Sequence, residues 1–167
     1  MPVGKNKKSF LELFEKHKSM AANVIYNICP DADVEALTQE TFIKVWRALP
    51  AFSLKSTHKT WIYRIAVNTA LDEARKNKSA AALFDRVDLL GQESGFEKKL
   101  EERDLVSAAM RALSADERAA LVLSVFEDLG YKEMSKILNA PEGTLKARVL
   151  GAKKKMKKRI EELLHGQ

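Results

Sequence analysis

The feature that most constrains the fold is a break between two helical patterns near the C-terminal end of the sequence. Apolar residues recur at intervals of three or four over residues 131–138 and again over 145–163, which predicts two helices. Between them, Asn139 favours the left-handed conformation that ends a helix, and Pro141 is preorganised for the start of the next one. Two helices joined by so short a turn form a helix-turn-helix, whose second helix offers its N-terminal residues to the DNA major groove. Many helical proteins contain such a turn, so the pattern favours DNA binding without requiring it.

The charge pattern strengthens this interpretation. The second helix contains "KARVLGAKKKMKKR", residues 146–159, with eight cations and no acid. Such a face repels itself unless a polyanion lies nearby. The whole chain has 29 Lys and Arg against 23 Asp and Glu, for a formal net charge of +6. This surplus favours either a nucleic acid or an anionic membrane surface as the partner.

A membrane protein is not expected from the sequence. No apolar run approaches the roughly 20 residues that a membrane-spanning helix needs. The basic N-terminal residues are not followed by the apolar stretch of a signal peptide. We therefore expect a cytoplasmic protein with no membrane partner.

The rest of the chain predicts an all-α fold of two small helical domains joined by a flexible linker, with the helix-turn-helix in the C-terminal domain. The apolar fraction of 46% is sufficient for hydrophobic cores. Residues 78–97 mix small residues, charges and glycines without a sustained period, which is typical of a tether. The predicted domains are therefore residues 1–77 and 98–167.

Helix boundaries can be predicted from capping residues. Pro30 is expected to end the first helix, because the residue before a proline is disfavoured in the helical region. Asp33 and Ser114 are expected to cap the N-termini of later helices, and Thr60 is a candidate cap for the helix that contains "TWIYRIAVNTALDEARK".

No motif predicts an enzyme, a cofactor or a metal. The sequence has no Gly-rich phosphate loop and no nucleophile elbow. No His and carboxylate residues occur at metal-ligand spacing, so we interpret His58 as a solvated loop residue. Cys29 is the single cysteine, which excludes an internal disulfide, and we interpret it as a buried thiol.

Three segments of the sequence resemble the extracytoplasmic-function (ECF) sigma factors of bacterial RNA polymerase. Residues 127–148, "EDLGYKEMSKILNAPEGTLKAR", are similar to the promoter-binding helix-turn-helix of that family, and Arg118 matches its lead-in helix. In the N-terminal half, "DVEALTQETFIKVWRAL" and "TWIYRIAVNTALDEARK" resemble two further segments of the family. The matches occur in the family's order and cover most of the chain.

The resemblance implies that the N-terminal domain binds core RNA polymerase and acts at the minus-10 promoter element. Three positions match the residues that face the polymerase clamp: Leu37, Gln39 and Glu40. Three others match the pocket that holds a flipped base of the melted non-template strand: Ala48, Phe52 and Asn68. By the same resemblance, the protein is a transcription initiation factor that promotes strand opening and has no catalytic residues.

The C-terminal domain is expected to bind the double-stranded minus-35 element. The residues expected at the DNA are Thr144, Lys146 and Arg148. The cations expected to contact phosphates are Lys153, Lys154 and Lys157. The family also leads us to expect a separate anti-sigma protein as a partner.

Several positions depart from the family pattern. Ala36 replaces an Asp in the polymerase-binding helix, and Ser53-Leu54 replaces Arg-Gly after Phe52. Ala147 and Gly151 replace a Ser and an Arg in the recognition helix. For this reason the promoter sequence cannot be inferred from the family.

The residues alone leave alternatives open. One is a helix-turn-helix repressor that binds DNA without polymerase, and another is a helical adaptor whose basic tail keeps it in solution. Leu37 is equally consistent with a place in the core. Phe52 lies in a polar loop after Pro50, which favours base stacking over packing.

Overall fold

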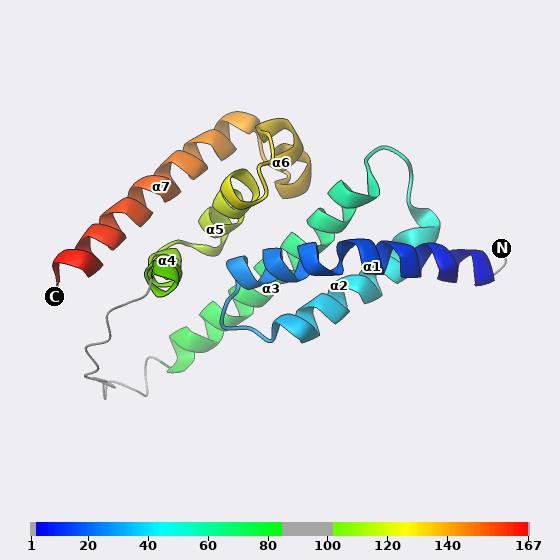
Figure 1. Cartoon of the computed structure of the whole chain (residues 1–167), viewed down its shortest axis with the longest axis horizontal. Helices are drawn as coiled ribbons and strands as arrows, with labels where there is room; N and C mark the ends of the chain where they lie inside the picture. Colours follow the sequence, from blue (N-terminus) through cyan, green and yellow to red (C-terminus); the bar gives the residue numbers. More distant parts are fainter. Residues whose placement is uncertain (1–2, 85–101, 167) are drawn as a thin grey trace.

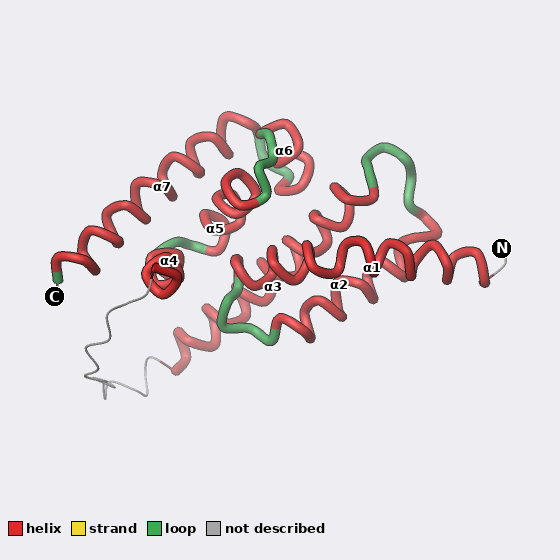
Figure 2. Tube along the Cα trace, viewed as in Figure 1, coloured by secondary structure: helices red, strands yellow, loops and turns green. Residues whose placement is uncertain are grey.

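The computed structural model describes residues 3–84 and 102–166, and the secondary structure of these residues is entirely helical (Figure 2). The elements in chain order are α1 (Val3–Ile28), α2 (Val34–Ala48), a 3-10 turn η1 (Leu49–Ala51), α3 (His58–Phe84), α4 (Glu102–Arg111), α5 (Ala115–Leu121), a π-helical segment η2 (Val122–Phe126), α6 (Tyr131–Leu138) and α7 (Glu142–His165). The all-α prediction is confirmed. Figure 1 shows α1 to α3 grouped together, with α5, α6 and α7 along one side of them.

The N-terminal helices begin and end where capping chemistry requires. The Ala36 N–H donates to Asp33 Oδ1 at 3.0 Å, so Asp33 caps α2 as predicted. The cap of α3 was predicted wrongly. The Thr60 N–H donates to Thr57 Oγ1 at 3.2 Å and the helix begins at His58, so Thr57 is the residue that caps it.

Helix α3 continues to Phe84, past residue 77 where the sequence predicted the first domain to end. The first residues of the predicted linker 78–97 therefore belong to this helix. The remainder of that linker and the predicted boundary at residue 98 lie outside the described residues.

The C-terminal helices are also fixed at their ends. Ser114 and Glu117 form a capping box, in which the Glu117 N–H donates to Ser114 Oγ at 3.2 Å and the Ser114 N–H donates to Glu117 Oε2 at 2.9 Å. Asn139 ends α6 with φ 50° and ψ 51°, which is the predicted left-handed conformation. The Ser135 hydroxyl donates to the Ala140 carbonyl at 2.6 Å and ties the turn to α6. The helix-turn-helix of α6 and α7 is thereby confirmed.

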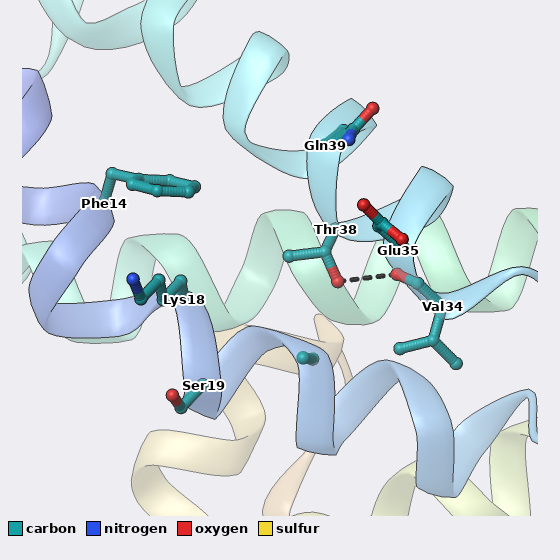
Figure 3. A pocket seen from close by; sticks show the side chains of 8 residues that line it. Phe14, Lys18, Ser19, Val34, Glu35, Thr38 and Gln39 are labelled. Atoms are coloured by element: carbon teal, nitrogen blue, oxygen red, sulfur yellow. Dashed lines mark hydrogen bonds between the residues drawn. The ribbon is translucent and has the colours of Figure 1, made fainter.

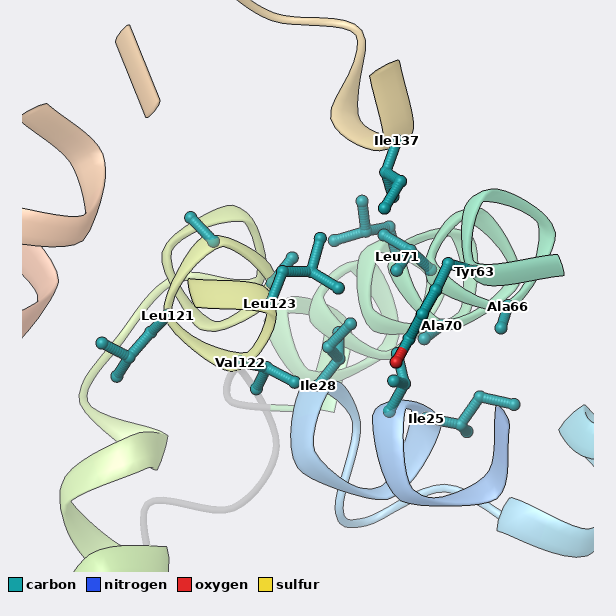
Figure 4. Close-up of a cluster of buried hydrophobic side chains, with 14 of the residues drawn as sticks. Ile25, Ile28, Tyr63, Ala66, Ala70, Leu71, Leu121, Val122, Leu123 and Ile137 are labelled. Atoms are coloured by element: carbon teal, nitrogen blue, oxygen red, sulfur yellow. The ribbon is translucent and has the colours of Figure 1, made fainter. Parts of the chain in front are cut away.

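One apolar core extends through both helical groups. Figure 4 shows Ile25 and Ile28 of α1 and Ala66 and Ala70 of α3 together with side chains of α5, η2 and α6. The members from the C-terminal half that the figure labels are Leu121, Val122, Leu123 and Ile137. The two halves are therefore in direct contact, which the sequence did not predict.

None of the described helices is both long enough and apolar enough to cross a membrane. In the same described residues, no group of three or more His, Cys, Asp or Glu side chains is placed to hold a metal ion.

Candidate nucleic-acid and partner interfaces

The N-terminal turns of α7 present polar side chains to solvent and apolar ones to the core. Leu145 and Val149 are fully buried against the other C-terminal helices. Thr144 and Lys146 are exposed, and Arg148 is half-buried. Thr144 and Arg148 are one helical turn apart and share a face of α7, whereas Lys146 lies on a different side of the helix.

Further along α7, exposed cations continue the same surface. Lys153, Lys154 and Lys157 are all exposed, as contacts to phosphate require. Lys155 differs from them because its Nζ donates to Glu117 Oε1 at 2.5 Å and joins α7 to α5. Burial acts to raise the pKa of Glu117, but the hydrogen bonds from Lys155 and Ser114 outweigh it and hold that pKa below its usual value.

Phe52 lies in an aromatic cluster that the sequence did not reveal. Its ring is stacked on His58 with centroids 4.4 Å apart and an interplanar angle of 28°, and it lies 4.7 Å from the ring of Trp61. His58 is the first residue of α3 and is half-buried, so its interpretation as a solvated loop residue is wrong. The spacing of three residues between His58 and Trp61, at the start of a helix, is the signal that places both rings on one face.

The other two predicted minus-10 residues lie on exposed parts of α2 and α3. Asn68 follows Trp61 by two helical turns and so lies on the same face of α3. Ala48 is exposed at the end of α2, one turn after Lys44. Lys44 Nζ donates to Thr69 Oγ1 at 3.1 Å, which fixes the end of α2 beside the part of α3 that carries Asn68.

The three predicted polymerase-binding residues of α2 do not share one surface. Gln39 and Glu40 are exposed, and Glu40 pairs with Lys44 at 2.9 Å. Leu37 is only 6% exposed and belongs to the core. Residues 36 and 40 lie on the solvent side of the helix, whereas position 37 faces inward.

An open pocket lies between α1 and α2 and includes Gln39 (Figure 3). Phe14 and Lys18 of α1 line one side of it, and Glu35 and Thr38 of α2 line the other. The Thr38 hydroxyl donates to the Val34 carbonyl at 2.7 Å, which turns its methyl group toward the pocket (Figure 3). The pocket at the junction of α1 and α2 therefore offers both apolar and charged groups.

These features define a class of protein. A helix-turn-helix whose second helix is rich in exposed cations is the arrangement of a DNA-binding protein, and the aromatic cluster lies on a separate helical group. The family model "Sigma-70 region 2" matches residues 13–80, and "Sigma-70, region 4" matches residues 103–156.

Curated relatives match over 95% of the chain. The chain is 30% identical over 172 residues to the ECF RNA polymerase sigma-E factor of Escherichia coli (strain K12), with 95% of this chain and 90% of the relative covered. It is 27% identical over 175 residues to the sigma-E factor of Haemophilus influenzae, with 95% and 91% covered. The chain belongs to the ECF sigma factors of the sigma-70 family. It is a non-enzymatic RNA polymerase subunit for promoter recognition and transcription initiation.

Solved structures show the same fold. The sigma factor RpoE in complex with the anti-sigma factor NepR, from Bartonella quintana, has a TM-score of 0.73 at 24% identity and covers 92% of this chain and 98% of that one. CnrH in complex with the cytosolic domain of CnrY has a TM-score of 0.68 at 20% identity and covers 93% and 89%. The family assignment removes the repressor and adaptor alternatives.

Proposed function

We propose that the Phe52 cluster holds an unpaired base of the minus-10 element during promoter opening. The observation that carries this proposal is the half-buried Phe52 ring, held by His58 at 4.4 Å and Trp61 at 4.7 Å. A ring fixed in this way would lose little side-chain entropy on stacking with a base. Asn68 offers an amide that both donates and accepts hydrogen bonds, which suits the edge of a flipped base.

The start of α7 is proposed to bind the minus-35 duplex. Thr144 and Lys146 are exposed where a recognition helix meets base edges, and Lys153, Lys154 and Lys157 follow the backbone phosphates. Arg148 is half-buried, one turn after Thr144.

The exposed side of α2 is proposed to dock on core polymerase. Gln39 and Glu40 supply the contacts, whereas Leu37 supports the helix from the core side. Ala36 replaces the family's Asp, and its exposed methyl group lies one turn before Gln39 and Glu40 on the same side of α2. Glu40 therefore carries more of the charge at this surface.

Transcription and binding assays with core polymerase test whether the chain acts as a sigma factor and whether α2 is the helix that docks. Core enzyme with the wild-type chain should begin transcription at a defined promoter, and Gln39→Ala combined with Glu40→Lys should weaken core binding while the helical content is unchanged. Glu12→Lys, an exposed charge reversal on α1, is the matched control. Undiminished core binding by the double variant would remove α2 from the interface.

An anti-sigma protein is proposed as a further partner, in the cytoplasm where polymerase works. The two structural relatives above were solved with such partners. In this chain, Val106, Val125 and Phe126 are exposed apolar residues that line a groove between α4, η2 and α7. A helix with apolar residues at intervals of three or four is the kind of segment that such a groove binds.

A further inference from the structure

An open pocket of about 430 Å³ lies apart from the one in Figure 3, where α1, α3 and the end of η2 meet. Helix α1 supplies Lys16, His17 and Asn23 to its lining, and α3 supplies Lys59. Pockets that bind small molecules range from about 300 to 1,000 Å³, so this one has room for a ligand larger than a water molecule. The proposed promoter and polymerase contacts use none of these residues.

His17 has a buried side chain that lacks a protein partner. It is only 5% exposed, and within the described residues its imidazole makes no hydrogen bond. The same residues contain no fully enclosed side-chain nitrogen or oxygen without a partner, so the unpartnered ring nitrogens reach the small accessible part of His17, at the pocket. Because buried polar groups are hydrogen-bonded as a rule, an imidazole left open to a pocket indicates that something bound there completes it.

Donor groups surround this imidazole. Lys16 and Lys59 are both exposed, and the Lys59 ammonium lies over the Tyr63 ring, 5.9 Å from its centroid. Burial, followed by the charges of Lys16, Lys59 and His58, holds the pKa of His17 below its usual value. The imidazole is therefore neutral at neutral pH and keeps one N–H donor. Two ammonium groups and this N–H are the donors that an anion requires.

Glu127 is the acidic residue among those that line the pocket. Its Oε2 accepts a hydrogen bond from the buried Tyr63 hydroxyl. Burial, followed by the bond to Glu127, raises the pKa of Tyr63 far above its usual value, so the hydroxyl remains a donor at neutral pH. The carboxylate is thus engaged within the protein, and the two lysines outnumber it. The resulting positive charge favours an anion over a metal cation as the ligand.

We propose that this pocket binds a phosphate group carried by a small phosphorylated molecule, with Lys16 and Lys59 neutralising its charge and the His17 ring N–H donating to one of its oxygens. Hydrogen bonds between ammonium groups and phosphate are among the stronger ones in proteins. Met20 and Asn23 complete the lining beside α1 and give the rest of the molecule one apolar and one amide contact. The proposal does not rest on the promoter or polymerase contacts proposed above.

NMR of the histidine side chains in the full-length chain reads this site directly. The sequence has three histidines, so their signals can be assigned with single His→Gln variants. The probe is AMP, titrated at constant ionic strength, and adenosine is the control that lacks the phosphate. AMP should shift the His17 signal saturably and raise its pKa, because a bound anion favours the protonated imidazole. Adenosine should do neither, and the exposed His165 at the end of α7 should not respond to AMP.

Variants at exposed lysines test the site without disturbing the buried His17. Lys59→Met keeps the apolar stem and removes the ammonium, so AMP binding should weaken by about tenfold, as expected for the loss of one hydrogen bond to a charged group. Lys76→Met makes the same change further along α3, outside the pocket, and should leave AMP binding unchanged.

A nucleic-acid strand carries the same phosphate chemistry, and Lys59 directly follows His58 of the aromatic cluster. A single-stranded oligonucleotide with the minus-10 sequence is therefore titrated in parallel with AMP. A saturable His17 shift with the oligonucleotide alone would assign the phosphate to the melted strand and overturn the small-molecule source. No saturable shift with either probe, or an AMP response that Lys59→Met leaves intact, would overturn the phosphate site itself.

Discussion

The two proposed DNA surfaces of this chain are built from opposite kinds of side chain. The surface on the N-terminal half is an aromatic cluster of Phe52, His58 and Trp61, whose rings are fixed by contact with one another. The surface on α7 is a row of exposed cations, of which Lys153 and Lys157 also line the groove between α4, η2 and α7. An unpaired base offers a face for stacking, whereas a duplex offers a regular array of phosphates. In the proposed roles, one small chain divides strand opening and duplex binding between two separate chemistries.

The two surfaces also differ in how the fold supports them. The aromatic surface depends on the position of α2 and the loop after it, so it should be sensitive to the packing of the N-terminal core. The cationic surface lies along a single helix, and its charges act at a distance through solvent. Substitutions should therefore have steep effects on the aromatic surface and graded effects on the cationic one.

The largest effect is expected at Leu37, which lies under the exposed side of α2. Leu37→Ala removes a side chain that is 6% exposed and should lower the free energy of unfolding by about 2–5 kcal/mol. Denaturant unfolding checks this. Because the core is continuous through both halves, one cooperative transition should shift as a whole.

Ile43→Ala is the control for Leu37, because Ile43 is on the same helix but 50% exposed. It should change stability by less than about 0.5 kcal/mol. Equal losses from both variants would contradict the placement of Leu37 in the core. Two separate transitions would show that the halves unfold independently.

The second effect concerns the aromatic surface. Phe52→Ala removes a stacking interaction worth roughly 1–3 kcal/mol, so open complexes should decrease by about ten- to a hundredfold. Core binding should be unchanged, and the defect should disappear on a template that is already mismatched across the minus-10 element. Promoter-complex assays on both templates check this.

Leu54→Ala is the matched control, because Leu54 is in the same loop and 88% exposed. It should leave strand opening near the wild-type level. If Phe52→Ala is equally defective on duplex and pre-melted templates, the ring supports the fold and the base site lies elsewhere.

Local chemistry explains which features could be predicted from the sequence. The caps at Asp33 and Ser114 and the left-handed Asn139 depend on residues within a few positions of one another, and all three are confirmed. The helix-turn-helix follows from the same short-range rules. Thr57 and Thr60 are both good capping residues, so the sequence alone does not separate them, and the structure shows that Thr57 is the cap.

Features that depend on long-range contact were not predictable in the same way. Helical spacing shows that Leu37 lies on an apolar face, but it does not say whether that face meets the core or a partner. The contact of Tyr63 with Glu127 joins residues far apart in the chain, and no local pattern indicates it. The ring partner of His58 is Phe52, which lies across a loop, so no helical spacing predicts their contact.

A third effect tests the cationic surface. Lys146→Ala removes one exposed cation from the start of α7. If Lys146 contacts a phosphate, the slope of log affinity against log salt should fall by roughly 0.9, so the gain in affinity from 200 to 50 mM salt shrinks about 3.5-fold. Titration of minus-35 duplex at several salt concentrations measures this slope.

Lys76→Ala, which removes an exposed cation on α3, should leave the slope unchanged. A base contact by Lys146 would instead appear as relaxed sequence preference with little change in slope.

The smallest effect is expected inside α7, where Gly151 replaces the Arg that is frequent in the family. A glycine in the middle of a helix is less stable than alanine, and a Cβ added at this position meets no atom within 4 Å. Gly151→Ala should therefore raise the free energy of unfolding by about 0.4–1 kcal/mol, measured by denaturant unfolding. Affinity for the minus-35 duplex and its salt slope should not change, because no charge is added.

Gly151→Arg provides the contrast, since it adds a cation to the surface and should steepen the salt slope by about 0.9 if the new side chain reaches a phosphate. A loss of stability in Gly151→Ala would mean that α7 is packed more tightly at this position than the open space around Gly151 indicates. The cationic surface would then depend on packing as the aromatic surface does, and the contrast between the two would fail.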